Sequence, residues 1–395
     1  MKIALVHDYL FEYGGAERVI EALHELYPDA PLYTSFVDPK RMGLHWEKFK
    51  DWDIRESWLT KIPFYKRLFS PLRLFALSFF EQFDFSEYDV VISSSNAYFA
   101  KGVITKSWTP HICYCHTPPR SLYGYTTMTD WKKNPVFRLA GNWINAQIKD
   151  QDYLAAQRVD QFVANSKEVQ GRIKKFYGRE SVVIYPPVDI SEKITTQQPN
   201  NTTTTEGYYL FVSRLAFSKH PELAVEVCTK LDLPLKVVGQ GKMLPRLKRI
   251  AGPTIEFTGE VSDAELSRLY QGAKALLYPV EDEDFGIVPV EAMGYGLPVI
   301  AHRSGGPKET IVDGKTGVFF DRLNAAELQK AIEKSNQIKW DPKAIHEHAL
   351  TFSKKRFQTE IKQLVQKLVE QFNPSIESKK STSSLNLAIG QVSRI

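Results

Sequence analysis

Short, continuous runs of apolar residues alternate with helix-like segments through the first half of the chain. The runs at 3–6 (IALV), 90–93 (VVIS) and 111–115 (HICYC) predict strands, and residues 16–27 place apolar side chains at helical spacing. The strand runs are apolar throughout and do not alternate with polar residues. They therefore predict a parallel sheet whose two faces are both covered by helices.

Residues 191–207 (SEKITTQQPNNTTTTEG) interrupt this rhythm, because they hold no aromatic residue and little that could be buried. Such a segment is typical of a surface linker. Beyond it the alternation restarts. The predicted strands are YYLFVS, LKVVG, IEFTG, ALLYP and PVIA, and the predicted helices begin at Pro221, Asp263 and close to Val288. With 395 residues the chain is long enough for two domains, and we predict a second parallel α/β domain.

The end of the chain predicts one amphipathic helix whose apolar stripe needs a partner. The stripe consists of Phe357, Ile361, Leu364, Leu368 and Phe372. We expect this helix to pack back toward the first domain. The predicted division is a first domain at 1–190, a linker at 191–206, a second domain at 207–352, the helix at 353–373 and a flexible tail at 374–395.

Composition narrows the class of protein. Apolar residues make up 43% and charged residues 25%, which is typical of a globular protein. The net charge of +5 is modest and does not indicate a nucleic-acid partner. Three cysteines cannot form a disulfide framework, and neither a signal peptide nor an apolar run of membrane-spanning length is evident. The expectation is a cytoplasmic protein.

Two pairs of residues, one of glycines and one of cations, suggest binding of an anion. Gly14 and Gly15 follow the first predicted strand and precede a helix, where backbone N–H groups could face a phosphate, although for this pair alone an ordinary strand–helix turn is the favoured interpretation. They do not form the G-x-G-x-x-G pattern of nicotinamide and flavin sites. Arg214 and Lys219 lie just beyond a predicted strand and could hold a diphosphate, or they could be solvated surface cations.

The stretch 281–301 (EDEDFGIVPVEAMGYGLPVIA) carries the most chemistry. Glu281 to Gly286 lie in the loop after a predicted strand, and Glu291 lies one turn inside the next helix. A carboxylate there suits the paired hydroxyls of a ribose, or it could simply complement the helix dipole. An Asp-x-Asp metal clamp at Asp282 and Asp284 is the alternative. No metal is expected, because Arg214 and Lys219 offer metal-free charge neutralisation.

The segment 111–120 (HICYCHTPPR) raises a zinc hypothesis, since His111, Cys113 and Cys115 would share one face of a strand. No second Cys/His pair lies nearby, so the four-ligand pattern is incomplete and buried structural cysteines are the favoured interpretation. His116, where the strand should end, is placed to reach a cleft between the two domains.

Together these motifs resemble the retaining glycosyltransferases of family 4, which have the GT-B architecture of two facing Rossmann-like domains. The resemblance covers roughly residues 1–372. It rests on the E-x7-E pattern of Glu283 and Glu291, on SRLAFSK, VANSKEVQGRIKKFYGRESVVIYPPVD and GGPKETIVDGKTG, and on Gly14-Gly15. The implied donor-binding residues are Gly14, Gly15, Arg214, Lys219, Glu283, Phe285, Gly286, Ile287, Val288 and Glu291.

The resemblance also implies roles. Arg214 and Lys219 would hold the diphosphate, Glu283 and the following loop the sugar, and Glu291 the ribose. His116 would lie near the transferred sugar. The implied catalytic group is Arg214, Lys219, Glu283 and His116, acting without a cofactor, a metal or a protein nucleophile.

The segment CHTPPRSLYGY is similar to one in bacterial mannosyltransferases of surface-polysaccharide synthesis. This similarity implies transfer of a hexose to a glycan or lipid-linked acceptor. Mannose is the expected sugar, and GDP-mannose is the expected donor. A UDP-sugar donor, a sugar-nucleotide epimerase and a non-catalytic nucleotide-sugar binding protein are the alternatives.

Residues 55–75 (RESWLTKIPFYKRLFSPLRLF) interleave five basic and five aromatic residues with one acid. This pattern suits peripheral contact with an anionic membrane, here the inner face, and it fits equally a pair of core helices with solvated charges.

Overall fold

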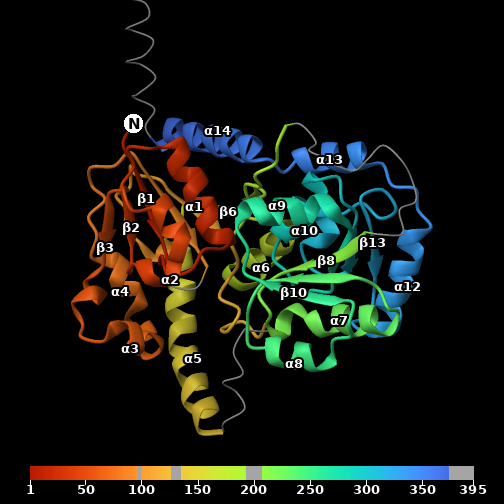
Figure 1. The fold of residues 1–395 in the computed structure, drawn as a ribbon. Helices are drawn as coiled ribbons and strands as arrows, with labels where there is room; N and C mark the ends of the chain where they lie inside the picture. The colour runs from red at the N-terminus through yellow and green to blue at the C-terminus, as the bar shows by residue number, and fades with distance from the viewer. Residues whose placement is uncertain (97–98, 126–134, 193–206, 373–395) are drawn as a thin grey trace, which may run out of the picture.

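The computed structural model describes residues 1–96, 99–125, 135–192 and 207–372. Two sheets, each of parallel strands, face one another across the molecule, and helices cover both faces of each sheet (Figure 1). The prediction of an α/β fold with two facing Rossmann-like domains is confirmed.

The first sheet has seven strands in the order β3-β2-β1-β4-β5-β6-β7. They are β1 (Ile3–His7), β2 (Leu32–Thr34), β3 (Ile54–Glu56), β4 (Val90–Ser95), β5 (His111–Cys115), β6 (Gln161–Ala164) and β7 (Ser181–Val183). The α-helices of this part are α1 (Gly15–Leu26), α2 (Pro39–Met42), α3 (Tyr65–Leu72), α4 (Ala76–Glu81), α5 (Pro135–Gln157) and α6 (Lys167–Tyr177).

The second sheet has six parallel strands in the order β10-β9-β8-β11-β12-β13. This is a doubly wound order: strands are added in one direction from β8 to β10 and in the other direction from β11 to β13, so the switch point lies between β8 and β11. They are β8 (Tyr208–Val212), β9 (Leu235–Val238), β10 (Ile255–Gly259), β11 (Ala273–Tyr278), β12 (Val299–His302) and β13 (Gly317–Phe320). The helices are α7 (Pro221–Lys230), α8 (Leu244–Ile250), α9 (Asp263–Gly272), α10 (Ile287–Gly294), α11 (Pro307–Thr310), α12 (Ala325–Asn336), α13 (Pro342–Leu350) and α14 (Lys354–Phe372).

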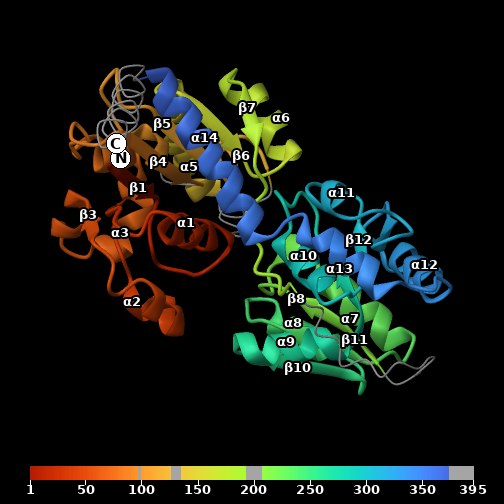
Figure 2. The ribbon, with the colours of Figure 1, turned by 90° about the horizontal axis from the view of Figure 1, so that it is seen from above.

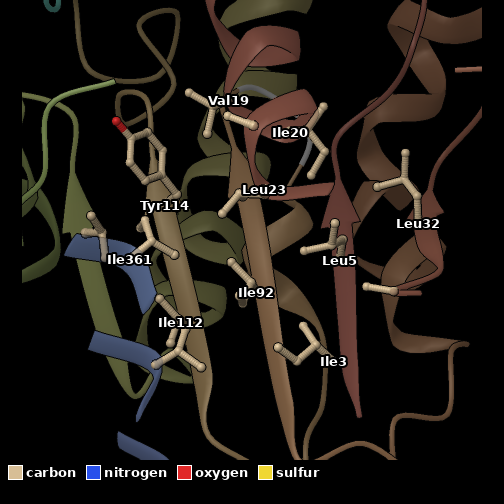
Figure 3. Packing of buried hydrophobic residues seen from close by; sticks show 14 of the residues in the cluster. Ile3, Leu5, Val19, Ile20, Leu23, Leu32, Ile92, Ile112, Tyr114 and Ile361 are labelled. Atoms are coloured by element: carbon tan, nitrogen blue, oxygen red, sulfur yellow. The ribbon is translucent and has the colours of Figure 1, made fainter. Parts of the chain in front are cut away.

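The core of the first domain forms where α1 lies over the central strands. Val19, Ile20 and Leu23 of α1 are fully buried against side chains of β1 and β4, among them Leu5 and Ile92 (Figure 3). The apolar face of this helix and the apolar side chains of the strands therefore form one buried cluster, as a parallel sheet covered on both faces requires.

The last helix, α14, returns to the first domain. It leaves the second domain near α13 and runs across to lie beside α1 (Figure 2). Phe357 and Ile361 join the core cluster of the first domain, and Ile361 lies next to Ile112 and Tyr114 of β5 (Figure 3). The side chains of α14 that are buried are Phe357, Ile361, Val365, Leu368 and Val369.

The sequence prediction of the stripe on α14 was partly wrong. Leu364 and Phe372 are only half-buried, whereas Val365 and Val369 are buried. The buried face of α14 is therefore wider than the stripe predicted from the sequence, because the helix packs against both α1 and β5.

None of the helices within the described ranges is long and apolar enough to cross a membrane. Of the predicted linker and tail, residues 193–206 and 373–395 lie outside the part of the chain that the structure describes.

Removal of α14 should expose the apolar surface that it covers on the first domain. Each of its five buried side chains contributes about 1.5 to 3 kcal/mol of burial, which is large against the net stability of a domain. We expect a chain ending at residue 352 to be insoluble or to melt at a much lower temperature in a thermal-unfolding measurement. The control is a chain that ends at residue 375, whose melting temperature should match that of the full chain. A soluble protein that ends at 352 and melts like the full chain would contradict this packing.

Candidate functional site

The candidate site lies where the carboxyl ends of the two sheets face each other. The loop after β1 meets the loop after β8, and the loop after β5 meets the loop after β11, on which the loop after β12 packs. In open parallel sheets this edge, next to the point where strand order reverses, is where ligands bind. The fold therefore brings the polar residues of these loops to the boundary between the domains.

The loop after β11 has a backbone that is strained and closely packed. Asp282 adopts a left-handed φ of 54°, and Gly286 has φ 85° at the N-cap of α10. The backbone N–H of Gly306 donates to the Glu283 carbonyl over 2.8 Å, and a Cβ at Gly305 would collide with that carbonyl. The Gly-Gly pair of the next loop thus allows the acidic loop to lie directly on its backbone.

Glu283 and Lys219 form an ion pair within the second domain, and their side chains are 19% and 16% exposed. Burial alone would raise the pKa of the Glu283 carboxyl. The ammonium of Lys219, Arg120 and the Tyr278 hydroxyl outweigh this effect, so the pKa is lowered. The carboxylate is consequently ionised and already holds the cation that was predicted to meet a diphosphate.

Glu291 lies one turn into α10 and is contacted from both domains. Arg18 of α1 donates to one carboxylate oxygen, and the Tyr270 hydroxyl donates to the other over 3.2 Å. The charge of Glu291 raises the pKa of the Arg18 guanidinium. A cavity of about 380 Å³ lies beside this group and is lined by Arg18, Tyr270 and Glu291 together with residues of α9 and α14. The cavity gives a polar ligand access to the carboxylate.

Arg214 lies in a different environment from Lys219, although both follow β8. Its guanidinium donates to Glu12 of the first domain over 3.0 Å, and the two side chains are 55% and 40% exposed. A pair this open to water contributes little to stability, so Arg214 can change partners easily.

The residues that follow Glu283 divide by their burial. Phe285 is buried and packs against Tyr185 and Phe352, so its side chain belongs to the core. Ile287 and Val288 are half-buried at the first turn of α10. Any contact of Phe285 or Gly286 with a ligand would therefore have to use the backbone.

Gly14 and Gly15 begin α1 and approach the second domain. A Cβ at Gly15 would lie 2.9 Å from Cδ1 of Ile287, which is closer than real Cβ contacts. The backbone N–H of Gly14 donates to Glu17 over 2.8 Å, so it is already satisfied within the helix start. In this structure Gly15 therefore allows the close approach of the two domains, and Gly14 caps α1.

His116 follows β5 and is almost fully buried. Its Nε2 lies 2.8 Å from the Ser94 hydroxyl. Loss of water contact, together with the nearby His7, lowers the pKa of His116 to about 3. The imidazole is therefore neutral at physiological pH.

Two arginines that the sequence reasoning did not assign hold the acidic loop from the first domain. Arg120 donates to the Asp282 carbonyl over 2.6 Å and pairs with Asp284 at 2.8 Å. Arg172 of α6 also pairs with Asp284 and donates to Thr117 over 3.1 Å. A signal was present, because Arg172 stands within the buried stripe of α6 between Val169 and Ile173.

The zinc hypothesis finds no support among the residues that the structure describes. Within them, no group of three or more His, Cys, Asp or Glu side chains could hold a metal ion. Cys113 and Cys115 are buried in an apolar cluster, and burial raises the pKa of both thiols. They are core residues, as the favoured interpretation expected.

Family models match the chain in two adjoining parts. The model described as Glycosyltransferase Family 4 matches residues 13–192, and the model described as Glycosyl transferases group 1 matches residues 192–349.

Curated relatives include several mannosyltransferases. A GDP-mannose-dependent alpha-mannosyltransferase of Mycolicibacterium smegmatis is 38% identical over 28% of this chain and 29% of its own length. The alpha-1,3/1,6-mannosyltransferase alg2 of Schizosaccharomyces pombe is 25% identical over 91% of this chain and 78% of its own. A glycosyltransferase of Methanocaldococcus jannaschii is 26% identical over 51% of this chain and 56% of its own length, so the chain spans between 29% and 56% of these two relatives.

Solved structures share the fold. The lipopolysaccharide outer core galactosyltransferase WaaB superposes with a TM-score of 0.63 at 18% identity, over 96% of this chain and 100% of WaaB. The HepE protein of Anabaena, solved in complex with UDP and glucose, superposes with a TM-score of 0.64 at 18% identity over 93% of this chain and 99% of HepE. With both halves matched by their models and both sheets in this arrangement, the chain belongs to the family 4 glycosyltransferases of GT-B fold.

Proposed function

We propose that the protein transfers a hexose, mannose from GDP-mannose, to a glycan or lipid-linked acceptor with retention of anomeric configuration. The observation that carries the proposal is the Lys219–Glu283 ion pair in the loops after β8 and β11, with Glu291 of the following helix paired to Arg18 of the first domain. Mannose is proposed because two relatives are mannosyltransferases, one matched over 28% of this chain and the other over 91%.

The proposed donor position follows the charges of the second domain. The diphosphate would take Lys219 and Arg214 as partners, the ribose hydroxyls would donate to Glu291, and the hexose would lie near Glu283 and His116. Lys219 would exchange Glu283 for the phosphate, and Arg214 would exchange the exposed Glu12. A UDP-sugar is the second candidate donor, since HepE of the same fold was solved with UDP and glucose.

The proposed reaction needs no protein nucleophile. The bond from the anomeric carbon to the diphosphate oxygen breaks, and a new bond to the acceptor oxygen forms on the same face of the sugar. The departing diphosphate oxygen takes the acceptor's proton. The protein's contribution is positioning and stabilisation of the growing negative charge by fixed cations.

We further propose that the reaction is independent of divalent metal. A metal clamp would need Asp284 as a ligand, and this carboxylate already lies between two arginines. Lys219 and Arg214 would neutralise the diphosphate in place of a metal.

The function is tested by incubation with GDP-mannose labelled in the sugar, together with membrane extract and EDTA. Label is expected to move into a larger product at the same rate with and without the chelator. Label that stays in a nucleotide sugar of altered configuration would indicate an epimerase, and binding without turnover would indicate a non-catalytic protein. Loss of transfer in EDTA, with recovery when magnesium or manganese is added, would instead favour a divalent metal bound by Asp282 and Asp284.

Substitution of the cations should affect chemistry more than binding. Negative charge grows on the diphosphate as the glycosidic bond breaks, so a fixed cation stabilises the transition state more than the ground state. Arg214→Ala and Lys219→Ala are each expected to lower kcat by about 10²-fold, with a smaller rise in KM for the donor. Glu291→Ala should mainly raise this KM, because ribose contacts are present before and during the reaction.

The matched controls for these variants are Lys174→Ala and Lys175→Ala, since both cations lie exposed on α6 of the first domain. Their steady-state constants should equal those of the unchanged protein. If Arg214→Ala and Lys219→Ala both retain full kcat at saturating donor, the diphosphate is held elsewhere.

The acceptor side of the proposal draws on residues 55–75. Residues 54–56 form the edge strand β3, so only the part from Trp58 onward is helical. Phe64, Leu68 and Phe75 are 75%, 45% and 54% exposed, and they lie among exposed cations. Trp143 of the neighbouring α5 is also 62% exposed, and α5 contacts the turn at 73–75.

Exposed apolar side chains and cations in one segment suit an anionic lipid surface, which would bring the enzyme to a lipid-linked acceptor. Part of the segment is otherwise engaged, because Lys66 pairs with Asp38 and Arg55 with Asp53.

Flotation with anionic liposomes tests the membrane contact. The protein should float with the vesicles at low salt and be released at high salt, since each cation near the surface adds about 1 kcal/mol. The triple change of Lys61, Lys66 and Arg67 to Gln should weaken binding by about 10²-fold. A double change of Lys330 and Lys343 to Gln, on exposed sites of the second domain, is the control. Binding that is absent, or equal in both variants, would favour solvated charges on packed helices.

A further inference from the structure

A buried row of polar side chains leads from the start of α1 to His116. The last residue of β1, His7, is paired with Ser94 of β4 in the register of the sheet. His7 Nδ1 lies 3.1 Å from the Ser94 hydroxyl, and that hydroxyl lies 2.8 Å from His116 Nε2. At the other end, His7 Nε2 lies 3.5 Å from Oε1 of Glu17. All four side chains are less than a tenth exposed.

Glu17 determines the direction of these hydrogen bonds. Its Oε2 accepts the backbone N–H of Gly14 over 2.8 Å, and an ionised carboxylate can only accept. A neutral His7 ring beside this carboxylate donates through Nε2–H and accepts at Nδ1, and the directions of the hydrogen bonds beyond it hold for this form of the ring. The Ser94 hydroxyl then donates to Nδ1 of His7, and its own oxygen accepts Nε2–H from His116. The accepting atom of the His116 ring is then Nδ1.

We infer that Glu17, His7 and Ser94 are positioning residues that hold His116 in the Nε2–H tautomer, with the Nδ1 lone pair as a hydrogen-bond acceptor. In the site, Nδ1 of His116 would accept a hydrogen bond from a hydroxyl of the sugar or of the acceptor, and that part of the inference rests on the proposed function. The direction of the hydrogen bonds does not rest on it. Glu17 lies in the helix that the Gly14-Gly15 turn begins, so the glycine turn and His116 belong to one connected structure.

Burial supports a fixed neutral ring at His116. Its surroundings disfavour the charged form, and Tyr114 lies beside the ring at a centroid distance of 5.2 Å. A neutral imidazole has one donor and one acceptor, and its partners decide which nitrogen carries the proton. Without the Ser94 contact, the two tautomers of His116 would be free to interconvert.

The tautomer can be measured directly in the full chain labelled with ¹⁵N at histidine. Two-bond ¹H–¹⁵N spectra at pH 8 distinguish Nε2–H from Nδ1–H, and the His116 signal is assigned by its disappearance in His116→Gln. The unchanged protein should show Nε2–H. Glu17→Gln has the same size, but its amide would accept from Gly14 and donate to His7 Nε2. This change reverses each later bond, so His116 should switch to Nδ1–H.

Kinetics give the second readout. With the donor of the proposed reaction, Glu17→Gln is expected to lower kcat about tenfold while KM for the donor stays unchanged. Ser94→Ala, which removes the link, should give mixed tautomers and a similar loss, and it keeps the inference testable if Glu17→Gln fails to fold. Glu87→Gln is the control, because this exposed carboxylate of the first domain contacts Lys2 and lies outside the cavity beside Glu291.

An Nδ1–H tautomer of His116 in the unchanged protein would overturn the inference. So would a tautomer that stays the same in a folded Glu17→Gln variant, or a full kcat in that variant. Failure of the proposed function would look different, since the unchanged protein would then transfer no sugar while its histidine spectrum still showed the Nε2–H form.

Discussion

The contact between Asp284 and the two arginines of the first domain is the interaction on which the geometry of the cleft depends. Asp284 lies in the strained loop after β11, and Arg172 is only 2% exposed where it meets it. A carboxylate with two guanidinium partners in a site largely shielded from water is costly to separate from them, because Asp284 would lose both of its ion-pair partners. The contact fixes the loop that presents Glu283, and it does so from the opposite domain.

The other charges across the cleft differ in how easily they can be exchanged. Arg214 and Glu12 are exposed, so water and a ligand can replace either partner at little cost. Arg18 and Glu291 are more enclosed, beside the cavity at α9 and α14. The charges across the cleft thus neutralise one another, and a nucleotide diphosphate would have to replace the carboxylates that are paired with the cations. This exchange would couple donor binding to the approach of the two domains.

Much of this arrangement could be predicted from the sequence. The strands β1, β4, β5 and β8 were found from continuous apolar runs, and α7 and α9 begin at the predicted residues Pro221 and Asp263. The short strands β2, β3, β6, β7 and β13 were missed, because a run of three or four residues gives only a weak periodic pattern. β3 overlaps the start of the basic and aromatic stretch 55–75, whose charges suggested a surface patch.

The site was predictable only as far as each loop carried its own chemistry. Glu283, Glu291 and Lys219 stand in recognisable local patterns and do lie at the boundary of the domains. The partners of these residues come from far along the chain, since Arg18 meets Glu291 and Arg172 meets Asp284 only after both sheets have formed. The buried row from Glu17 to His116 likewise depends on the register of β1 with β4, which no local pattern encodes.

The central claim is that the cleft binds a nucleotide sugar through the second domain, and thermal unfolding with a panel of GDP-, UDP- and ADP-linked sugars tests it most directly. A ligand of the folded state at 100 times its Kd stabilises the protein by about 2.7 kcal/mol, which appears as a rise of a few degrees in Tm. The account predicts that one base class raises Tm in the unchanged protein and that Glu291→Ala removes most of this rise. No shift with any nucleotide sugar, or an equal shift in Glu291→Ala, would contradict it.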